Sequence, residues 1–384
     1  MGAGRPRILF LAARYPAPAR RGDQVRALHL AGALGKRADV RLLAFGDGTG
    51  PPIEGVDART VPTGLGGRLA ANLTAAPRLP AQVRLYLDTA MKRAVAAQLA
   101  DWEPDVLHVT LARMAPYMPA RAAFHRHLDL TDSLGLNMRT RAGSERGPAR
   151  AAFAAESRLM VAYEARMAAR ADTCSVVSEA DRGMPGLGGA AVIPNGVDLD
   201  AFPFVPRAAA GPVLAFFGNL GYFHNVEPAG FLAREVLPRV RREQPAARLL
   251  LVGARPAAAV RRLAELDGVE LRADVPDMAV ALADAAIAVL PSFSGSGIKN
   301  KVLEAFCGGL PVVGNRLGVQ GVDGALDGHH LRIAEDADGI AAAALSLLAD
   351  TAERERLALA ARSLILERYT WERQAERLLE LYGV

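Results

Sequence analysis

Short apolar runs alternate with longer helical patterns along this chain, and the alternation occurs twice. In the first half, apolar runs of strand length occur at residues 8–12, 40–45, 106–109, 128–130 and 174–177. Between them, apolar residues recur with helical spacing at residues 24–34, 89–100 and 149–169. Buried parallel strands connected by amphipathic helices produce this order, so we expect a parallel sheet covered by helices.

A second set of the same kind follows a proline-rich stretch at residues 193–212, and such stretches often connect domains. Its expected strands are residues 213–217, 248–252, 269–271, 287–290 and 311–313. Its expected helices are residues 231–244, 256–266, 277–285, 299–307 and 339–348. A last helical pattern at residues 351–382 is interrupted near Tyr369-Thr370-Trp371. We therefore expect two doubly wound α/β domains.

The composition excludes several classes of protein. Of the 384 residues, 51% are hydrophobic, which is enough for a core in each domain. The two cysteines, Cys174 and Cys307, provide neither a disulfide framework nor zinc-ligand spacing, and this favours a reducing cytoplasm. No apolar run has the length of a membrane span, and no signal-peptide cleavage site follows the run at residues 8–13.

Charge is unevenly distributed between the two halves. Residues 1–190 contain 26 basic and 17 acidic residues, whereas residues 191–384 contain 20 and 24. A basic half can face anionic lipid, nucleic acid or an acidic substrate. Aromatic residues are only 5% of the chain and no basic–aromatic motif occurs, so we do not expect nucleic acid as a partner. We expect a mobile segment, either lipid-facing or simply solvated, around Arg139, Arg141, Arg146 and Arg150.

The segment at residues 291–313 is the most informative for function. A loop of small residues joins an expected strand to an expected helix, and Lys299 and Lys301 stand at the helix start. Glu304 lies about one turn further on. Backbone amides at a helix N-terminus bind anions, and a carboxylate accepts hydrogen bonds from sugar hydroxyls. The pattern therefore suits a nucleotide sugar, with its diphosphate on the amides and its ribose on Glu304.

The same segment resembles the donor-binding segment of retaining glycosyltransferases of family 4, which have the GT-B fold. The family pattern is Gly-(Thr/Ile)-(Arg/Lys)-x-Lys-(Val/Ile)-Leu-Glu-Ala, and residues 297–305 fit it at every position. Pro-Asn-Gly-Val-Asp at residues 194–198 is similar to the family sequence near the interdomain crossover. Many members have a second glutamate where this chain has Ser296. Tyr222 with the pair His224-Asn225 resembles a bacterial branch associated with exopolysaccharide synthesis.

The resemblance implies a GT-B fold, with two Rossmann-like domains and the donor site in the cleft between them. It implies an acceptor-side domain at residues 1–198 and a nucleotide-sugar-binding domain at residues 199–368, with residues 369–384 packing back on the first. The residues expected to bind the donor are Gly22, Asp23, Gly218, Asn219, His224, Asn225, Ser296, Gly297, Ile298, Lys299, Asn300, Lys301 and Glu304. The acceptor-side candidates are Arg26, His108, Thr110 and Asp132, and the catalytic candidates are Lys301, Glu304 and Asp132.

Several of these residues also have an ordinary structural explanation. The turn at Gly22 could be a plain connection between a strand and a helix, with Asp23 capping that helix. Asp132 follows an expected strand and could cap the next helix, a role that Ser133 could fill equally well. Ser178 is interpreted as a helix cap without a functional role.

Two histidines are weaker candidates. His108 ends an expected strand, near a family histidine that contacts the donor sugar, and the second place of the family's His-x-His pair is Thr110 here. A strand histidine bonded to its surroundings is the alternative. His224 could donate a hydrogen bond to a phosphate oxygen or be a solvated loop residue. The family's usual basic residue in that loop is absent, so Lys299 and Lys301 are expected to neutralise the diphosphate.

The resemblance implies transfer of a sugar from a nucleoside diphosphate to a glycan or polyprenyl-linked acceptor, with retention of configuration. The implied mechanism has no protein nucleophile, so catalysis rests on positioning and on stabilising the leaving diphosphate. No metal and no cofactor besides the donor are expected, and the expected location is the cytoplasm, with peripheral contact to the inner membrane face. The alternatives are an epimerase or hydrolase, for which no convincing acid–base set occurs, and a non-catalytic sugar-nucleotide- or partner-binding module.

Overall fold

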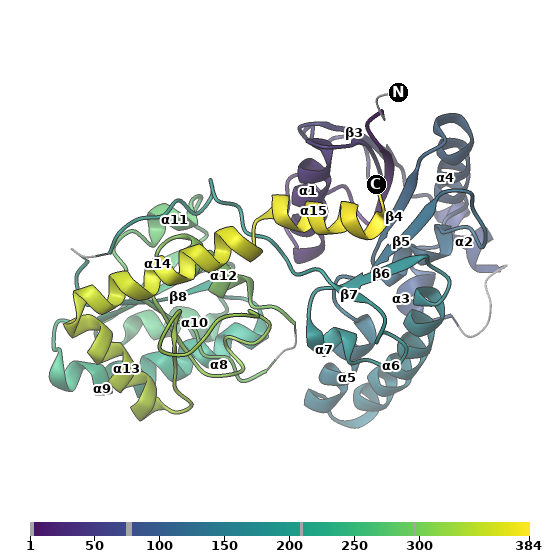
Figure 1. The fold of residues 1–384 in the computed structure, drawn as a ribbon. Helices are drawn as coiled ribbons and strands as arrows, with labels where there is room; N and C mark the ends of the chain where they lie inside the picture. Colours follow the sequence, from purple (N-terminus) through teal and green to yellow (C-terminus); the bar gives the residue numbers. More distant parts are fainter. Residues whose placement is uncertain (1–3, 74–78, 208–209, 295–296) are drawn as a thin grey trace. The chain divides into compact units, whose positions relative to one another are not determined.

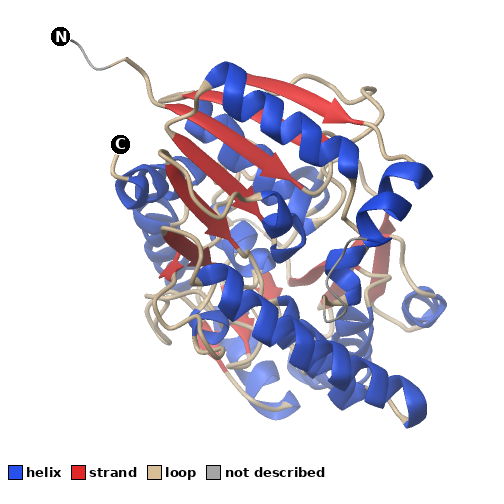
Figure 2. Ribbon diagram, turned by 90° about the vertical axis from the view of Figure 1, so that its right-hand side faces the viewer, coloured by secondary structure: helices blue, strands red, loops and turns tan. Residues whose placement is uncertain are grey.

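The computed structural model describes residues 4–73, 79–207, 210–294 and 297–384. The chain forms two compact units (Figure 1): residues 1–196 with 371–384 form unit 1, and residues 197–370 form unit 2. The expected boundaries, at residues 198 and 368, differ from these limits by two residues. Each unit contains a parallel sheet with helices packed on it (Figure 2), which confirms the prediction of two doubly wound α/β domains.

The sheet of unit 1 is parallel throughout, with the strand order β3-β2-β1-β4-β5-β6-β7. Its strands are β1 (Arg7–Ala12), β2 (Asp39–Phe45), β3 (Val56–Val61), β4 (Val106–Thr110), β5 (His125–Asp129), β6 (Thr173–Val176) and β7 (Ala191–Val192). Its helices are α1 (Gly22–Gly35), α2 (Leu65–Leu73), α3 (Ala81–Arg84), α4 (Thr89–Trp102), η1 (Ala112–Tyr117), α5 (Leu134–Ser144), α6 (Gly147–Ala168), α7 (Glu179–Arg182) and α15 (Trp371–Tyr382).

Strand β1 divides the core of unit 1 into two layers. Ile8 and Phe10 belong to the apolar cluster that includes residues of α1 and α15. Leu9 and Leu11 belong to the other cluster, which includes residues of α4 and α6. Successive side chains of a strand point to opposite faces of a sheet, so a run of four apolar residues is what a strand covered on both faces requires.

Helix α15 completes unit 1 from the far end of the chain. The Trp371 ring stacks on His29 of α1, with a centroid distance of 5.2 Å and an interplanar angle of 7°. Gly196 packs against Trp371, since a Cβ atom at residue 196 would lie 2.6 Å from the Trp371 backbone nitrogen. The glycine of Pro-Asn-Gly-Val-Asp is therefore needed for close packing of α15.

The sheet of unit 2 is also parallel, with the strand order β10-β9-β8-β11-β12-β13. Its strands are β8 (Val213–Asn219), β9 (Arg248–Ala254), β10 (Val269–Ala273), β11 (Ile287–Val289), β12 (Val312–Gly314) and β13 (Arg332–Ile333). Its helices are α8 (Phe223–Phe231), η2 (Leu232–Val236), α9 (Leu237–Glu243), α10 (Ala258–Arg261), η3 (Arg262–Glu265), α11 (Met278–Ala281), α12 (Asn300–Cys307), α13 (Ala337–Ala349) and α14 (Thr351–Arg368). No helix in the described ranges is long and apolar enough to cross a membrane.

Unit 1 differs from the sequence-based expectation in several places, among them strand β3 and residues 139–150. Strand β3 was not predicted, because its charged residues Asp57 and Arg59 alternate with small or weakly apolar ones at the edge of the sheet. The segment expected to be mobile is instead helical. Arg139 and Arg141 lie in α5, and Arg150 lies in α6, where the two helices pack against each other.

Candidate functional site

The candidate site of unit 2 begins where strand β8 ends. Gly218 has φ +131, a backbone conformation that L side chains rarely adopt, and Asn219 follows it. The Asn219 side-chain oxygen accepts a hydrogen bond from the backbone nitrogen of Gly221 at 3.1 Å, which closes the turn into α8. The carboxyl ends of parallel strands are where ligands of open α/β sheets bind. The loop is therefore positioned to present backbone amides to a ligand.

A lysine of α12 reaches this loop. The Lys301 Nζ atom donates a hydrogen bond to Oδ1 of Asn225 at 2.7 Å, and Nδ2 of Asn225 donates to the Asn219 carbonyl oxygen at 2.9 Å. The ammonium also lies over the Phe216 ring, 4.3 Å from its centroid. A Cβ atom at Gly218 would lie 4.0 Å from Lys301 Nζ. The structure thus brings together predicted residues from two segments that are distant in the sequence.

Glu304 lies on the same helix as Lys301, one turn further on. Burial raises the pKa of Glu304 to about 7, while the charge of Lys301 opposes this shift. Burial lowers the pKa of Lys301 to about 8, with Glu304 acting in the opposite direction and Lys299 in the same one. Among the described residues, none donates a hydrogen bond to the Glu304 carboxylate. A carboxylate in this state is available to accept hydrogen bonds from ligand hydroxyls.

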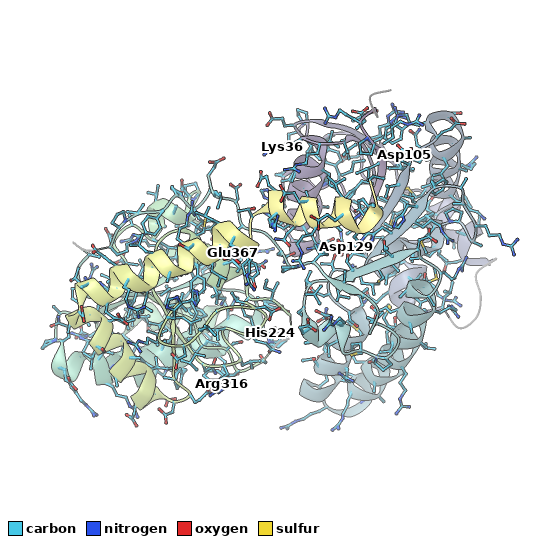
Figure 3. The ribbon with its side chains drawn as sticks, in the orientation of Figure 1. Lys36, Asp105, Asp129, His224, Arg316 and Glu367 are labelled. Carbon is cyan, nitrogen blue, oxygen red and sulfur yellow. The ribbon has the colours of Figure 1, made fainter. Side chains whose placement is uncertain are left out.

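His224, labelled in Figure 3, lies at the start of α8 and is bonded to the loop after β11. Its Nδ1 atom and Oγ of Ser294 are hydrogen-bonded. Phe223 packs against the imidazole at a centroid distance of 3.7 Å. Burial and the nearby Lys299 charge lower the pKa of His224, so the ring is neutral at pH 7. His224 is therefore a half-buried connection rather than the solvated loop histidine considered above. Ser296 lies outside the described residues.

The entry to α12 is shaped by the predicted Gly297 and Ile298 together with Gly321 and Asn315, which the sequence analysis missed. Gly297 has φ +80, and the neighbouring Ile298 packs on Gly321, where a Cβ atom would lie 2.9 Å from Ile298 Cα. Asn315 exchanges two hydrogen bonds with the backbone of Ser292, donating to its oxygen at 2.8 Å and accepting from its nitrogen at 2.9 Å. The signal for Asn315 was its place directly after a buried strand, at the ligand-binding edge of the sheet.

The loop after β1 in unit 1 differs from the expectation in one respect. Helix α1 begins at Gly22, and the cap position is Arg21, which makes no side-chain cap bond. Asp23 does not cap the helix, because its carboxylate forms an ion pair with Arg14. Gly22 is exposed, and a Cβ atom there would meet nothing within 4 Å. The backbone at Gly22 is thus open to an approaching group.

Arg26 is fully buried together with Asp129, so its guanidinium is not available for the acceptor contact assigned to it. Asp129 is labelled in Figure 3. The Arg26 Nε atom donates to Oδ2 of Asp129 at 2.7 Å, and NH1 donates to Pro194 O at 3.2 Å and to Oδ1 of Asn195 at 3.0 Å. Burial alone would raise the pKa of Asp129, but the charge of Arg26 and its hydrogen bond to the carboxylate act in the opposite direction, and the pKa is lowered overall. Arg26 therefore anchors the segment that leaves unit 1.

His108 and Thr110 are also buried, so the proposed acceptor contacts are not available in this structure. The His108 Nδ1 atom and the Tyr382 hydroxyl are 2.6 Å apart, which ties β4 to α15. Burial lowers the pKa of His108 to about 4, although Asp129 opposes this shift. His108 is therefore a neutral strand histidine that is hydrogen-bonded within the protein, which was the alternative to a substrate contact.

Asp132 is exposed at the start of α5, while Ser133 is the residue that caps this helix. The Leu136 backbone nitrogen donates to Ser133 Oγ at 3.1 Å. Ser178 caps α7 as interpreted, accepting from the Asp181 nitrogen at 3.3 Å. Asp132 therefore follows the carboxyl end of β5, and Ser133 rather than Asp132 is the N-cap of α5.

Two Asp-x-Asp triplets occur in unit 2, and both have structural roles. Asp198 accepts hydrogen bonds from the backbone nitrogen of Asp200, at 3.0 Å, and of the residue after it. Asp336 caps α13, and Asp338 forms an ion pair with Arg239. Over the described ranges, no group of three or more His, Cys, Asp or Glu side chains is arranged to hold a metal ion.

Comparisons with known proteins agree with the fold. Residues 21–196 match the glycosyl transferase 4-like domain, and residues 211–350 match the glycosyl transferases group 1. Glycogen synthase of Mycobacterium tuberculosis is 29% identical over 304 residues, which are 73% of this chain and 69% of that protein.

Solved structures resemble the whole described chain. Sucrose-phosphate synthase from Thermosynechococcus elongatus has a TM-score of 0.71 at 19% identity, covering 99% of this chain and 98% of that one. HepE of Anabaena in complex with UDP-glucose has a TM-score of 0.66 at 15% identity, covering 98% and 99%. With its two matched domains and its paired parallel sheets, the chain belongs to the glycosyltransferases of the GT-B fold.

Proposed function

We propose that this glycosyltransferase moves a sugar from a nucleoside-diphosphate sugar to a glycan or lipid-linked acceptor with retention of configuration. The observation that carries the proposal is the hydrogen bond between Lys301 and Asn225 beside Gly218, with Glu304 one turn away. The cation and the glycine backbone suit the diphosphate of such a donor, the backbone by allowing close approach. The carboxylate suits its sugar hydroxyls.

The donor is held by charge and by backbone groups. Lys301 neutralises the diphosphate, assisted by Lys299 at the N-terminal end of α12. The backbone of Gly218 and Asn219 donates to the phosphate oxygens, and Glu304 accepts from the ribose hydroxyls. The structures of Anabaena HepE with UDP and with UDP-glucose support a donor of this class.

Catalysis rests on stabilising the leaving group. The bond between the sugar and the diphosphate breaks, and the acceptor oxygen attacks on the same face of the sugar. A diphosphate oxygen takes the acceptor proton, so no protein nucleophile is needed. Lys301 stabilises the charge that develops on the diphosphate, and its fixed position reduces the reorganisation cost. We propose that lysine charge, rather than a divalent cation, performs this role.

The biological role that we propose is synthesis of an exopolysaccharide or another cell-surface glycan. The motif Tyr222 with His224-Asn225 supports this assignment, because it resembles the branch of the family associated with such synthesis. The basic character of residues 1–190 suits an enzyme that works at the inner face of the membrane, where anionic lipids attract positive charge.

The first test is thermal stabilisation by UDP-, GDP-, ADP- and dTDP-sugars, with and without a metal chelator. A ligand present at 100 times its dissociation constant adds about 2.7 kcal/mol to the free energy of unfolding. One nucleotide class should stabilise the protein and Glu304→Ala should abolish the shift, whereas the exposed Glu367→Ala on α14 should retain it. Absence of any shift would favour the non-catalytic alternative.

A further inference from the structure

A pocket in unit 1 lies at the carboxyl ends of three adjacent strands, β1, β2 and β3. It has a volume of about 720 Å³. Its lining residues are Ala13, Arg14, Tyr15, Phe45, Gly46, Asp47, Pro62, Thr63, Arg68, Leu85 and Tyr86. We call it the β1–β3 pocket. None of the donor residues predicted from the sequence lines it. Ligands of open α/β sheets bind outside the carboxyl ends of the strands, so this is a place where unit 1 can hold a substrate.

The aromatic wall of the pocket is held firmly. The Tyr15 hydroxyl donates to the Pro51 carbonyl oxygen at 2.7 Å, and the Tyr15 backbone nitrogen donates to Phe45 O at 2.9 Å. Gly50 lies against the ring, since a Cβ atom there would be 2.0 Å from Cε1 of Tyr15. Tyr86 faces Phe45 with a ring-centroid distance of 6.3 Å. Rigid aromatic faces of this kind bind sugar rings or apolar chains at little entropic cost.

Two arginines of the pocket differ in their pairing. The Arg14 guanidinium is shared between Asp23 and the Tyr86 hydroxyl, so most of its charge is compensated within the protein. Arg68 is exposed on α2, and in the described part of the chain no carboxylate or other acceptor pairs with its guanidinium. Arg68 therefore supplies an uncompensated planar fork of donors, the geometry that suits phosphate.

The position of Arg68 follows from the packing of α2. Gly67 lies against Asp88, because a Cβ atom at residue 67 would be 2.7 Å from Oδ1 of that residue. Asp88 is itself fixed as the N-cap of α4, where it accepts a hydrogen bond from the Ala90 nitrogen at 2.7 Å. The glycine before the arginine thus lets α2 approach the start of α4, and the arginine is held at the pocket.

Asp47 is another polar residue that lines the pocket. Its Oδ1 atom accepts hydrogen bonds from the Thr49 hydroxyl at 2.6 Å and from the Thr49 backbone nitrogen at 3.1 Å. These bonds lower the pKa of Asp47, so the side chain is an anion at neutral pH. A pocket lined by both an anionic acceptor oxygen and a cationic fork suits a ligand that has both hydroxyl groups and a negative group.

We propose that the β1–β3 pocket binds the acceptor, and that the acceptor carries a phosphate group held by Arg68. The proposal rests on the proposed function, since it identifies the second substrate of that reaction. The sugar hydroxyls lie toward Asp47, and the rings of Tyr15 and Tyr86 cover the apolar faces. The phosphate belongs either to a soluble sugar phosphate or to a polyprenyl lipid. Leu69 and Leu85, which are 65% and 62% exposed, offer an apolar surface for a lipid.

The test is titration calorimetry on the full chain saturated with the nucleotide found above. The probes are a hexose 6-phosphate, the same hexose without phosphate, and farnesyl diphosphate. A phosphorylated probe should bind and the neutral hexose should not. Arg68→Gln should weaken binding of the phosphorylated probe by about tenfold or more, the usual effect of losing a charge-assisted hydrogen bond. Binding of hexose phosphate indicates a soluble acceptor, and binding of farnesyl diphosphate alone indicates a lipid acceptor.

The matched control is Arg158→Gln, which removes the same charge from an exposed position on α6, a helix that contributes nothing to the pocket. It should leave binding of the probes unchanged. Neither variant should change nucleotide-induced stabilisation, which separates this inference from the proposed function. Equal effects of the two variants, or no binding of any phosphorylated probe to a protein that binds nucleotide, would overturn the proposal.

Discussion

Lys301 on α12 and Asn225 on α8 are joined by a hydrogen bond of 2.7 Å between Nζ and Oδ1. The two residues are 76 positions apart in the sequence. The bond directs the ammonium toward Gly218 and the end of strand β8. Because the cation is already held in place, the binding of a diphosphate requires little reorganisation of the protein.

Removal of the Lys301 charge should slow the reaction more than it weakens substrate binding. We expect Lys301→Ala to lower kcat by about 10²–10³-fold, the usual cost of losing one group that stabilises charge in the transition state. Steady-state kinetics at saturating donor measure this. Lys92→Ala, which removes an exposed lysine of α4, is the control and should be neutral. A kcat within a few-fold of the parent enzyme would contradict the assigned role.

The enzyme should be most active over a narrow range of pH. Glu304 must be ionised to accept hydroxyl hydrogen bonds, and its pKa is about 7. Lys301 must be protonated to neutralise the diphosphate, and its pKa is about 8. We therefore expect the profile of kcat/KM for the donor to be bell-shaped, with its maximum between these values. In Glu304→Gln the acidic limb should disappear, and its persistence would assign that limb to another group.

Glu304 should also make the stability of the fold depend on pH. Its folded-state pKa, about 7, lies above the ordinary value of 4.5, so the folded protein holds the proton more tightly than the unfolded chain. The stabilisation is complete below pH 4.5 and is lost as the pH rises through 7. Glu304→Gln resembles the protonated carboxyl, so urea denaturation should show the parent and the variant alike near pH 4.5 and the parent becoming less stable than the variant as the pH rises through 7. A difference that does not vary with pH would contradict the raised pKa.

Gly321 should be required for donor binding because it supports Ile298. An alanine Cβ would lie 2.9 Å from the Ile298 backbone, so Gly321→Ala should displace the entry to α12 and raise the donor KM. The matched control is Gly328→Ala. Both glycines have positive φ, +82 and +73, but at Gly328 the nearest atom is the flexible end of Arg332 at 3.5 Å. Both variants should lose about 1–2 kcal/mol from backbone strain, and only Gly321→Ala should change KM.

The buried pair of Arg26 and Asp129 should be essential for the stability of unit 1. Asp129→Ala leaves a buried guanidinium without its partner, so we expect a loss of about 3–5 kcal/mol in the free energy of unfolding. Asp172→Ala provides the comparison, since Asp172 is 41% exposed in its pair with Arg126 and should cost about 0–1 kcal/mol. Chemical denaturation would measure both. Similar losses in the two variants would show that the buried pair contributes no more than a surface pair.

The sequence located the strand–helix junctions that carry the candidate donor residues of unit 2, for a physical reason. Gly218 and Lys301 each lie where a buried strand leads into a helix, and apolar periodicity locates such junctions directly. All these junctions occur at the same edge of a parallel sheet, so residues from different loops must meet there. The role of Asn315 could have been predicted by the same argument applied to the strand after α12.

The errors concern residues whose environment depends on distant partners. Arg26 was assigned to the acceptor because it follows the loop after the first strand, but its partner Asp129 is 103 positions away. His108 is similarly fixed by Tyr382, which is 274 positions away. No local pattern reports such pairing. Arg68 was missed because its helix, α2, is only nine residues long and contains two glycines, and because strand β3, beside the pocket, has a mostly polar face.

The packing of α15 against α1 affects how the newly made protein acquires its structure. Unit 1 is not continuous in the sequence, because residues 371–384 supply Trp371 and Tyr382 to its interior. A ribosome must therefore synthesise both units before the first can be completed, whereas unit 2 is continuous and can close earlier. We expect the nascent first unit to expose apolar surface for most of translation, which makes it a substrate for chaperones.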